Sequence, residues 1–425
     1  MASATNAAQN YSANVAILQQ KTIKESWYNT FWARWSGMTD ISQDDNGNIL
    51  TRPSGKPIEM FTDFIQKGRD NMLLPMRMNL TGSPVFGDTV VKGTGEDQDL
   101  DWLRLYVNQT RKAVMAQSGA MANEYVKMYN MIEEAAPRLR DWLTKYDNQD
   151  VARCFYNGVG ENLATGTSDD GKGLAKRLHP NFYYNDGGVL TTAGTAGSTK
   201  LEANVDTGAA SGLYGLTSDI LEFLNPVMQE RLIPQIVSEG GHPYWAGVIS
   251  PEQNAVLFAD AGFKAANQAA WTGLKTNDEQ RGFVGYYAGF ALFQDLISIR
   301  SWNTTDQGFF GASTATAFAK SVLPTDKNQN AIFFGNGAVG KGISRGKAKF
   351  TTELDDHENI KEIAVSVING YNRADYFDEA VDGETAAYGA TNAFSKNNAS
   401  EAYHTSAIAC TNQSSLILMT KSTAT

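Results

Sequence analysis

The chain has 425 residues, which is enough for two or three domains or for one large elaborated domain. Asp and Glu number 46 against 36 Lys and Arg, and the resulting net charge of −10 argues against a dedicated nucleic-acid binder, whose affinity comes mainly from basic side chains. Hydrophobic residues at 42% exclude a disordered chain, while charged residues at 19% are few and suggest a surface that partners cover.

The two cysteines, Cys154 and Cys410, are too few for a disulfide framework or a zinc ribbon, so we expect a reducing compartment. Residues 1–20 contain neither a basic region nor an apolar core, and we expect no signal peptide. Uninterrupted apolar runs reach about five residues, as at 255–259, far below the ~20 that span a bilayer. These features favour a soluble intracellular protein.

Residues 1–57 are polar and show no sustained hydrophobic period, so the sequence predicts an N-terminal arm that cannot close a core of its own. The arm carries Trp27, Trp32 and Trp35, and an aromatic group of this size is uncommon on the surface of an isolated monomer. Two interpretations are open: the tryptophans pack on their own domain, or they dock on a neighbouring subunit.

Residues 58–75 predict a short helix that ends near Gly68, and residues 76–114 predict an extended hairpin. Between its two strands the hairpin carries a glycine-rich, acidic excursion that has little apolar area to bury. The free energy needed to order this excursion must therefore come from contacts elsewhere, and neighbouring subunits are the natural source. The candidate contact residues are Gly82, Gly87, Asp88, Lys92, Glu96, Asp97, Asp99 and Asp101.

Residues 115–158 show a helical period and predict one long amphipathic helix, which Pro137 should kink or divide. Residues 159–215 are rich in Gly, Thr, Ala and Ser, and we interpret them as a surface insertion of loops and short strands. The hydrophobic stripe of the long helix is typical of a packed face and not of a cofactor site.

Residues 216–425 predict a sheet-rich domain with few helices, which makes the chain an α+β protein with mainly antiparallel sheets. One helix should begin at Thr217 and stop at Pro226, and another should cover 251–268, because Ser250 and Gln253 form a capping box. The predicted strands are HPYWAGVI, GFVGYY, GFALF, DLISIRSW, KEIAVSVING and SSLILMT.

One glycine-rich segment imitates nucleotide-binding motifs. Gly335, Gly337 and Gly340 match G-x-G-x-x-G, and Lys341 stands where a P-loop lysine would, but position 342 is Gly where a P-loop has Ser or Thr. The residues that follow are poor helix formers, whereas both motifs place phosphate on a helix N-terminus. We therefore interpret the segment as a loop. The four histidines lie far apart and no catalytic motif is present, so we expect no enzyme activity, metal or cofactor.

Several passages carry a family resemblance: FIQKGRDNMLLPMRMNLTGSPVFGD, WLRLYVNQTRKAVMAQSGAMANE, RLRDWLTKYDNQDVARCFYNG, HPYWAGVISPEQ, GFVGYYAGFALFQD and INGYNRADYFDE. In this order they resemble the major capsid proteins of tailed phages, specifically those of the N4-like podovirus group. The passages cover about residues 58–378, and the arm, the insertion and residues 380–425 lie outside them.

The resemblance implies a Hong Kong 97-type capsid fold. Residues 1–57 would be the N-arm, 76–114 the E-loop, 115–158 the spine helix of a peripheral domain, and 216–425 an axial domain with returning peripheral-domain strands. It implies a subunit that forms hexamers and pentamers in an icosahedral shell around double-stranded DNA. The arm and the E-loop would lie across neighbouring subunits, the DNA would be near without specific contact, and assembly would take place in the host cytoplasm.

The same resemblance implies a portal protein, and scaffold or decoration proteins, as further partners, and no membrane. Two other hypotheses remain open. The first is an encapsulin-like cage of the same fold that holds an enzyme instead of a genome. The second is a β-rich hydrolase or adhesin, which would be a soluble monomer with one dominant polar cleft.

Overall fold

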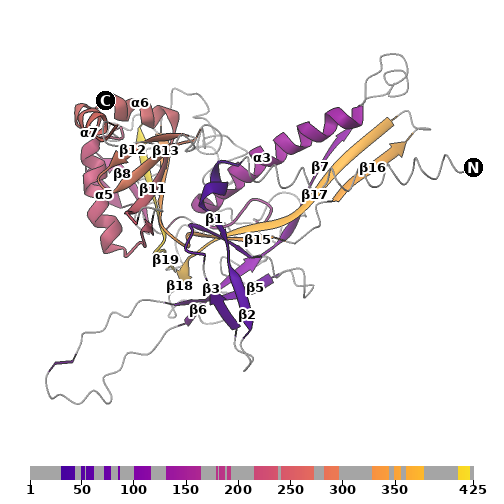
Figure 1. The fold of residues 1–425 in the computed structure, drawn as a ribbon, viewed down its shortest axis with the longest axis horizontal. Helices are drawn as coiled ribbons and strands as arrows, with labels where there is room; N and C mark the ends of the chain where they lie inside the picture. Colours follow the sequence, from indigo (N-terminus) through magenta and orange to yellow (C-terminus); the bar gives the residue numbers. More distant parts are fainter. Residues whose placement is uncertain are drawn as a thin grey trace, which may run out of the picture.

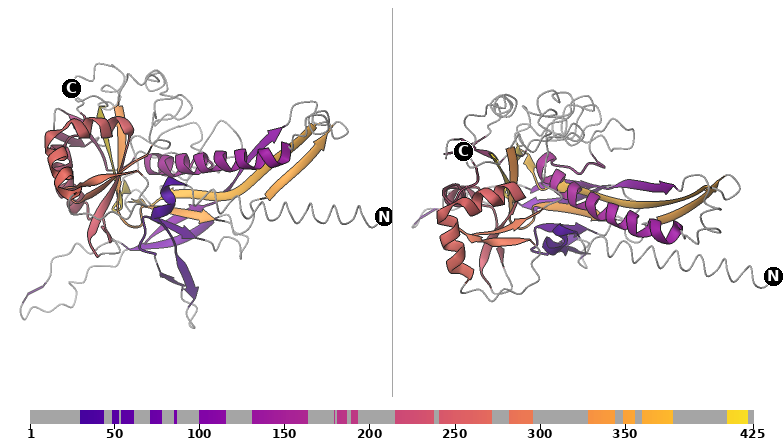
Figure 2. Two further views of the ribbon diagram at one scale, coloured as in Figure 1. Left: turned by 45° about the horizontal axis from the view of Figure 1, so that its top comes forward. Right: turned by 90° about the horizontal axis from the view of Figure 1, so that it is seen from above.

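In the computed structural model the subunit has a compact region and an elongated region (Figures 1 and 2). The compact region is a mixed β-sheet with helices along it, whereas a single long helix lies beside long strands in the elongated region. The arrangement is α+β, as the sequence predicts. The described residues are 30–43, 49–52, 54–61, 71–77, 85–86, 100–115, 131–163, 179, 181–186, 189–192, 215–237, 241–271, 282–295, 328–343, 349–355, 360–377 and 410–421.

The compact region is built on a sheet with the strand order β12-β13-β11-β14-β20-β8-β9. The short strand β10 also pairs with β11, outside this order. Most neighbours are antiparallel, but β11–β13 and β20–β8 are parallel. Apolar side chains of α5, such as Ile220 and Leu224, form one buried cluster with Trp245, Phe290 and Leu418 of the sheet. The strands are β8 (Phe182–Asp186), β9 (Val189–Thr192), β10 (Ile236–Val237), β11 (Pro243–Ile249), β12 (Phe283–Tyr287), β13 (Phe290–Gln294), β14 (Asn328–Phe334) and β20 (Ser415–Lys421), and the helices are α5 (Ser218–Glu230), α6 (Pro251–Ala259) and α7 (Ala261–Trp271).

The elongated region is organised by one long strand, β17 (Ile360–Arg373). The first half of β17 pairs with both β16 and β7, and its last residues pair with β15, which continues through β4 to β1. The long helix α3 (Met131–Asn157) lies along β7 and β17 (Figure 2). Leu139 of this helix packs on Ile363 and Val365. The bounds of the other strands are β1 (Ser36–Met38), β4 (Ile58–Phe61), β7 (Asn108–Met115), β15 (Val339–Ile343) and β16 (Lys349–Asp355).

Three smaller antiparallel pairs complete the described sheets. β5 (Asn71–Arg77) pairs with β6 (Leu100–Tyr106), so a hairpin forms, but its first strand begins at Asn71 and not at residue 76, inside the segment predicted as a helix. β2 (Asp40–Gln43) pairs with β3 (Ile49–Arg52), and β18 (Tyr376–Phe377) pairs with β19 (Cys410–Thr411). The predicted strand DLISIRSW lies outside the described residues except for its first residue.

Two helix predictions are partly wrong. Residues Ile58–Phe61 form strand β4 and not the start of a helix, because β4 lies between β1 and β15 as a parallel partner of both. Pro226 does not end α5, which continues to Glu230. Pro137 lies inside α3 on its exposed side, and the long helix extends to Asn157. Residues 62–70 and 116–130 lie outside the described residues.

The capping box at Ser250 and Gln253 is present, but the helix that it starts is shorter than predicted. The helix breaks at Asp260, whose backbone is extended. The carboxylate of Asp260 accepts hydrogen bonds from the amide and hydroxyl of Ser218, both at 2.6 Å, and from the amide of Gly262 at 3.0 Å. Asp260 thus joins the start of α7 to the start of α5, and this contact between distant residues divides one predicted helix into α6 and α7.

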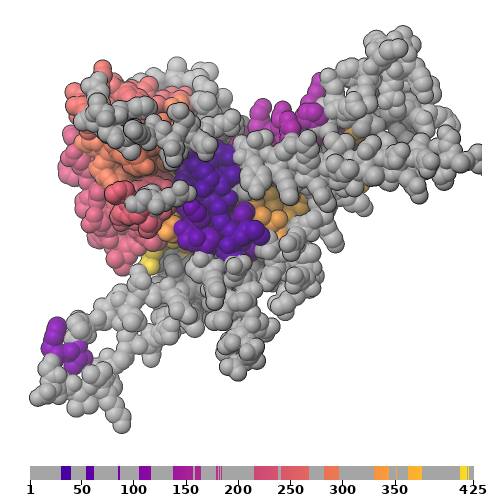
Figure 3. Space-filling model, viewed as in Figure 1, coloured from indigo at the N-terminus to yellow at the C-terminus, as the bar shows by residue number. Residues whose placement is uncertain are grey.

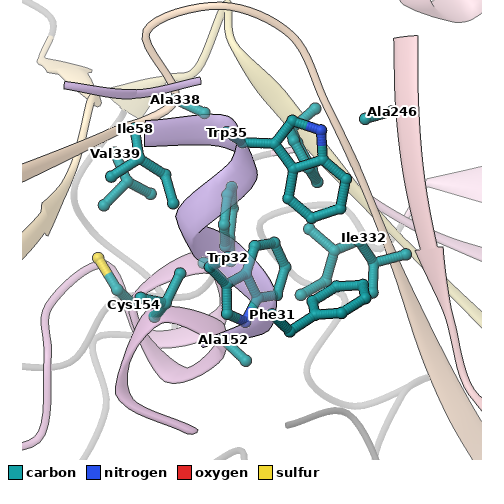
Figure 4. Packing of buried hydrophobic residues seen from close by; sticks show 14 of the residues in the cluster. Phe31, Trp32, Trp35, Ile58, Ala152, Cys154, Ala246, Ile332, Ala338 and Val339 are labelled. Carbon is teal, nitrogen blue, oxygen red and sulfur yellow. The ribbon is translucent and has the colours of Figure 1, made fainter. Parts of the chain in front are cut away.

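An aromatic cluster from the N-terminal segment fills the space between the compact and elongated regions (Figure 4). The surface of this segment lies between the two regions (Figure 3). The short 3-10 helix η1 (Phe31–Trp35) buries Trp32 and Trp35. The ring of Trp32 lies 5.5 Å from that of Phe155 on α3 and 5.8 Å from that of Phe334 on β14. The structure therefore places Trp32 and Trp35 in the core of their own subunit, which corrects their assignment as contacts to a neighbour. Trp27 lies outside the described residues.

We predict that Trp32→Ala destabilises the subunit by about 3 to 5 kcal/mol, because it removes a fully buried indole and leaves a cavity between α3 and β14. Urea unfolding of the purified chain measures the change. Met38→Ala is the matched control, since this β1 side chain is 57% exposed and its loss should cost less than about 0.5 kcal/mol. Equal effects of the two substitutions would contradict the role of Trp32 as a core residue.

Candidate functional site

A buried ion pair lies where the two regions of the subunit meet. The guanidinium of Arg373, at the end of β17, donates from Nε and Nη2 to the two carboxylate oxygens of Asp375 at 2.7 and 2.8 Å. Its Nη1 donates to the carbonyls of Phe155 and Tyr156 in the last turn of α3, at 2.6 and 3.2 Å. A positive charge at a helix C-terminus also offsets the negative end of the helix dipole. We call Arg373 and Asp375, with the end of α3, the buried junction.

Asn412 extends the buried junction to β20. Its Nδ2 donates to Asp375 Oδ1 at 2.9 Å and to the carbonyl of Ala374 at 3.0 Å. Its Oδ1 accepts from the amides of Ser414 and Ser415 at 2.9 and 2.7 Å. One buried amide side chain therefore connects the end of β17 to the turn that starts β20. Buried polar groups that are satisfied in this way favour a single arrangement of the elements that carry them.

His179 and Ser415 lie next to this network and superficially resemble a nucleophile–base pair, with His179 Nε2 2.9 Å from Ser415 Oγ. The amide of Asn181 donates to His179 Nδ1 at 3.0 Å, so the proton of the neutral imidazole lies on Nε2 and points to Ser415. Ser415 Oγ in turn donates to Asn412 Oδ1. Burial lowers the pKa of His179 well below its usual range. Since a general base must accept the serine proton, this pair has a structural and not a catalytic arrangement.

The glycine-rich segment that imitates a nucleotide site folds as a turn followed by strand β15, not by a helix. Gly335 is explained by packing, because a Cβ there would lie 1.8 Å from the carbonyl oxygen of Pro234. Lys341 is only 4% exposed, and its Nζ lies 5.0 Å from the centre of the Tyr371 ring. These positions argue against phosphate binding, because the lysine faces the interior and no helix N-terminus follows the turn within the described residues 335–343.

Lys341 belongs to a buried cluster of charged groups between α3, β15 and β17. Asp147 of α3 accepts hydrogen bonds from Asn369 Nδ2 at 3.2 Å and from the Tyr371 hydroxyl at 3.3 Å. Burial raises the pKa of Asp147, and the charge of Lys341 opposes this increase. Burial likewise lowers the pKa of Lys341 to about 8, against the attraction of Asp147 and Asp150. The cluster attaches α3 to the sheet by charge and hydrogen bonds in addition to apolar packing.

The sequence contains a signal for this cluster that the periodicity analysis misses. The buried side of α3 continues the spacing of Leu139 and Leu143 to Asp147 and then to Asp150 and Val151. A carboxylate at a position where the helical period requires an apolar residue is expensive to bury unless it is paired. Acidic residues on the apolar stripe of a helix therefore indicate a buried polar contact, although they do not identify its partner.

The candidate inter-subunit residues of the hairpin excursion lie almost entirely outside the described residues. Asp101 is in β6, where it is paired with Met76 of β5. Within the excursion the structure describes Val85 and Phe86, and the Phe86 side chain is 78% exposed. Their role in contacts between subunits stays a prediction. The other candidates outside the described residues are Gly82, Gly87, Asp88, Lys92, Glu96, Asp97 and Asp99.

Two further features concern ligands and membranes. Among the described residues, no three His, Cys, Asp or Glu side chains lie close enough together to hold a metal ion. Within the same segments of the chain, no helix combines the length and the apolar character needed to cross a bilayer.

Solved structures with a similar fold include several phage heads. The capsid of Ralstonia phage GP4 matches with a TM-score of 0.54 and 16% identity, covering 86% of this chain and 87% of that chain. The capsid asymmetric unit of cyanophage Pam1 matches with a TM-score of 0.53 and 13% identity, covering 92% of each chain. The head structure of Helicobacter pylori bacteriophage KHP40 matches with a TM-score of 0.51 and 12% identity, covering 87% and 88%.

The sequence itself matches the family model described as phage capsid protein over residues 30–393. No curated protein matches the chain. The family match extends over most of the sequence and includes both the Arg373–Asp375 pair and the β5–β6 hairpin. The chain therefore belongs to the phage capsid protein family.

Proposed function

We propose that this capsid protein is the major subunit of an icosahedral shell that encloses the double-stranded DNA of a tailed phage. The carrying observation is the β5–β6 pair, whose strands flank a glycine-rich and acidic excursion that has little apolar area to bury and in which Phe86 is 78% exposed. Contacts with a neighbouring subunit would supply the free energy needed to order this excursion. The fold shared with phage capsids supports the same assignment.

In this proposal the subunit has the regions of a Hong Kong 97-type capsid protein. The β5–β6 hairpin is the E-loop, α3 is the spine helix of the peripheral domain, and the compact sheet is the axial domain. The residues before η1 and the excursion lie across neighbours in hexamers and pentamers. The net charge of −10 fits a container, because like-sign repulsion disfavours a grip on the packaged phosphates.

The proposal extends to the finer assignments made from the sequence. The passages FIQKGRDNMLLPMRMNLTGSPVFGD and WLRLYVNQTRKAVMAQSGAMANE support the N4-like podovirus group, with assembly in the bacterial cytoplasm. A portal protein, and scaffold or decoration proteins, are the further partners that such a shell requires. Particles that contain a protein cargo instead of DNA would favour the encapsulin-like alternative.

We predict that replacing residues 83–99 by a short Gly-Ser turn prevents closed shells while the subunit still folds. The excursion has four glycines and five acids between Gly82 and Asp101 and thus little apolar area to stabilise the subunit. Electron microscopy of assembly mixtures measures shell formation, and the melting temperature of the unassembled subunit is the internal control. Normal shells from this variant would contradict the assembly role, and an unfolded monomer would place the excursion in the core.

A finer version of the same test is Phe86→Ala. The substitution removes an exposed aromatic side chain, so the free energy of unfolding of the subunit should change by less than about 0.5 kcal/mol. If Phe86 enters a pocket on a neighbour, assembly should require about tenfold more protein or more, since a buried aromatic contact contributes over about 1.4 kcal/mol. Light scattering against protein concentration measures this midpoint. An unchanged midpoint would exclude Phe86 from the contact.

We also predict that Arg373→Met destabilises the subunit by about 3 to 5 kcal/mol, because Asp375 would keep a buried charge without its cation. Two carbonyls of α3 would lose their donor as well. Urea unfolding of unassembled subunits checks the change. Arg140→Met on the same helix is the control, since Arg140 forms a partly exposed pair with Asp141 and should cost at most about 1 kcal/mol.

A further inference from the structure

The loop that follows α3, residues 158–163, attaches the end of the helix to the elongated sheet. The amide of Gly160 donates to the carbonyl of Tyr371 at 2.8 Å, which extends the pairing of β17. Asn162 Nδ2 donates to the carbonyl of Asn369 at 2.8 Å, and the carbonyl of Asn162 accepts from Asn108 Nδ2 at 2.7 Å. The loop thus contacts both β17 and β7. Interactions that attach the loop to α3 therefore also attach α3 to the sheet.

The contact between the loop and α3 contains two buried acceptors without a donor. Asp150 of α3 is fully buried, and its Oδ1 accepts from the amide of Glu161 at 2.6 Å. Its Oδ2 and the Oδ1 of Asn162 are buried and have no hydrogen-bond partner among the described residues. Both oxygens border the same point, because a Cβ on Gly160 would lie 2.8 Å from the first and 3.2 Å from the second.

Rotating the side-chain amide of Asn162 by 180° would not give these two oxygens a donor at acceptable cost. Its Nδ2 already donates to the carbonyl of Asn369 and lies 3.4 Å from Thr110 Oγ1. Exchanging the two amide atoms would place an oxygen against the carbonyl oxygen of Asn369. The orientation of Asn162 is therefore fixed, and its Oδ1 borders the same point as Asp150 Oδ2. Two buried acceptors that border one point need a donor, since an unsatisfied buried acceptor is costly.

We propose that Asp150 carries a proton in the folded subunit and that its carboxyl group donates a hydrogen bond to Asn162 Oδ1, so that this bond latches loop 158–163 onto α3. The latch is closed when Asp150 is protonated. When the carboxyl ionises, the donor to Asn162 Oδ1 is lost, and of these contacts only the hydrogen bond from the Glu161 amide to Asp150 Oδ1 still holds the loop on the helix. The inference concerns the subunit alone and does not depend on the proposed shell.

The charges around Asp150 agree with this arrangement. Burial raises the pKa of Asp150 to about 7, against the charge of Arg153 and the hydrogen bond from the Glu161 amide, while the carboxylates of Glu161 and Asp147 raise it further. Across the packing, β15 contributes Lys341 and β17 contributes Tyr371, and Tyr146 lies on the same helix.

The sign of the pH dependence follows from the raised pKa. Between the ordinary value of 3.8 and about 7, the folded subunit keeps a proton that the unfolded chain has lost. The stability that Asp150 contributes is therefore greatest in acid and falls as the pH rises through this range. The loop should therefore lose protection from hydrogen exchange progressively as the pH rises from about 4 to about 7, and above about pH 7 the carboxyl is ionised and the latch is open.

Asp150→Asn tests the proposal directly. The Asn amide can donate to Asn162 and accept from the Glu161 amide, so it copies the protonated carboxyl at every pH. In hydrogen exchange corrected for intrinsic rates, the Glu161 and Leu163 amides of the parent chain should lose up to about tenfold protection per pH unit between about pH 4 and about pH 7, and little more above that range. The Asp150→Asn variant should show no such loss. Asp141→Asn, whose side chain is 70% exposed on the same helix, is the control and should behave like the parent.

Carbon-13 NMR of the Asp150 carboxyl in the parent chain, labelled at Asp, gives a second measurement that needs no variant to fold. A carboxyl that remains protonated at about pH 6 supports the latch. A carboxylate at that pH, with the loop still protected, would overturn it and would indicate a water molecule that donates to both oxygens instead. Equal pH dependence of exchange in the parent and in Asp150→Asn would also overturn it.

Discussion

The charged pair of Arg373 and Asp375 is the contact on which the arrangement of the subunit depends. It lies where the long strand β17 ends, where α3 ends, and where the Asn412 turn leads into β20. Burying a guanidinium is costly unless its donors are used, and a planar fork that pairs with a carboxylate and two helix carbonyls meets that condition. Because the partners come from different elements, the pair is satisfied in one relative placement of the compact and elongated regions.

The aromatic cluster around Trp32 complements this polar contact. Polar networks specify geometry but contribute modest net stability, whereas large buried rings contribute mostly through area. Trp32 and Trp35 contact side chains of α3, β13 and β14. They therefore also fill the space between the compact and elongated regions. Together the two contacts hold the compact and elongated regions in one arrangement.

The elements that local signals determine were predicted well. Ser250 and Gln253 begin a helix as their capping pattern indicates, and the predicted strands KEIAVSVING and SSLILMT form β17 and β20. Elements whose structure depends on partners far away in the sequence were predicted poorly. Ile58–Phe61 has an ambiguous pattern and becomes a strand because β15, from far along the chain, pairs with it. The buried junction had no sequence signal, since nothing local distinguishes Arg373 from a surface arginine.

The position of η1 has a consequence for the order of events during synthesis. Phe31, Trp32 and Trp35 leave the ribosome early, yet Trp32 and Trp35 contact Phe334, which is made about 300 residues later. At roughly 5 to 20 residues per second, these rings wait roughly 15 to 60 seconds for that partner. Contacts of such long sequence separation also form slowly. The nascent chain therefore exposes a hydrophobic aromatic surface for most of its translation. We expect chaperones to bind this surface and expression of the protein to be sensitive to temperature.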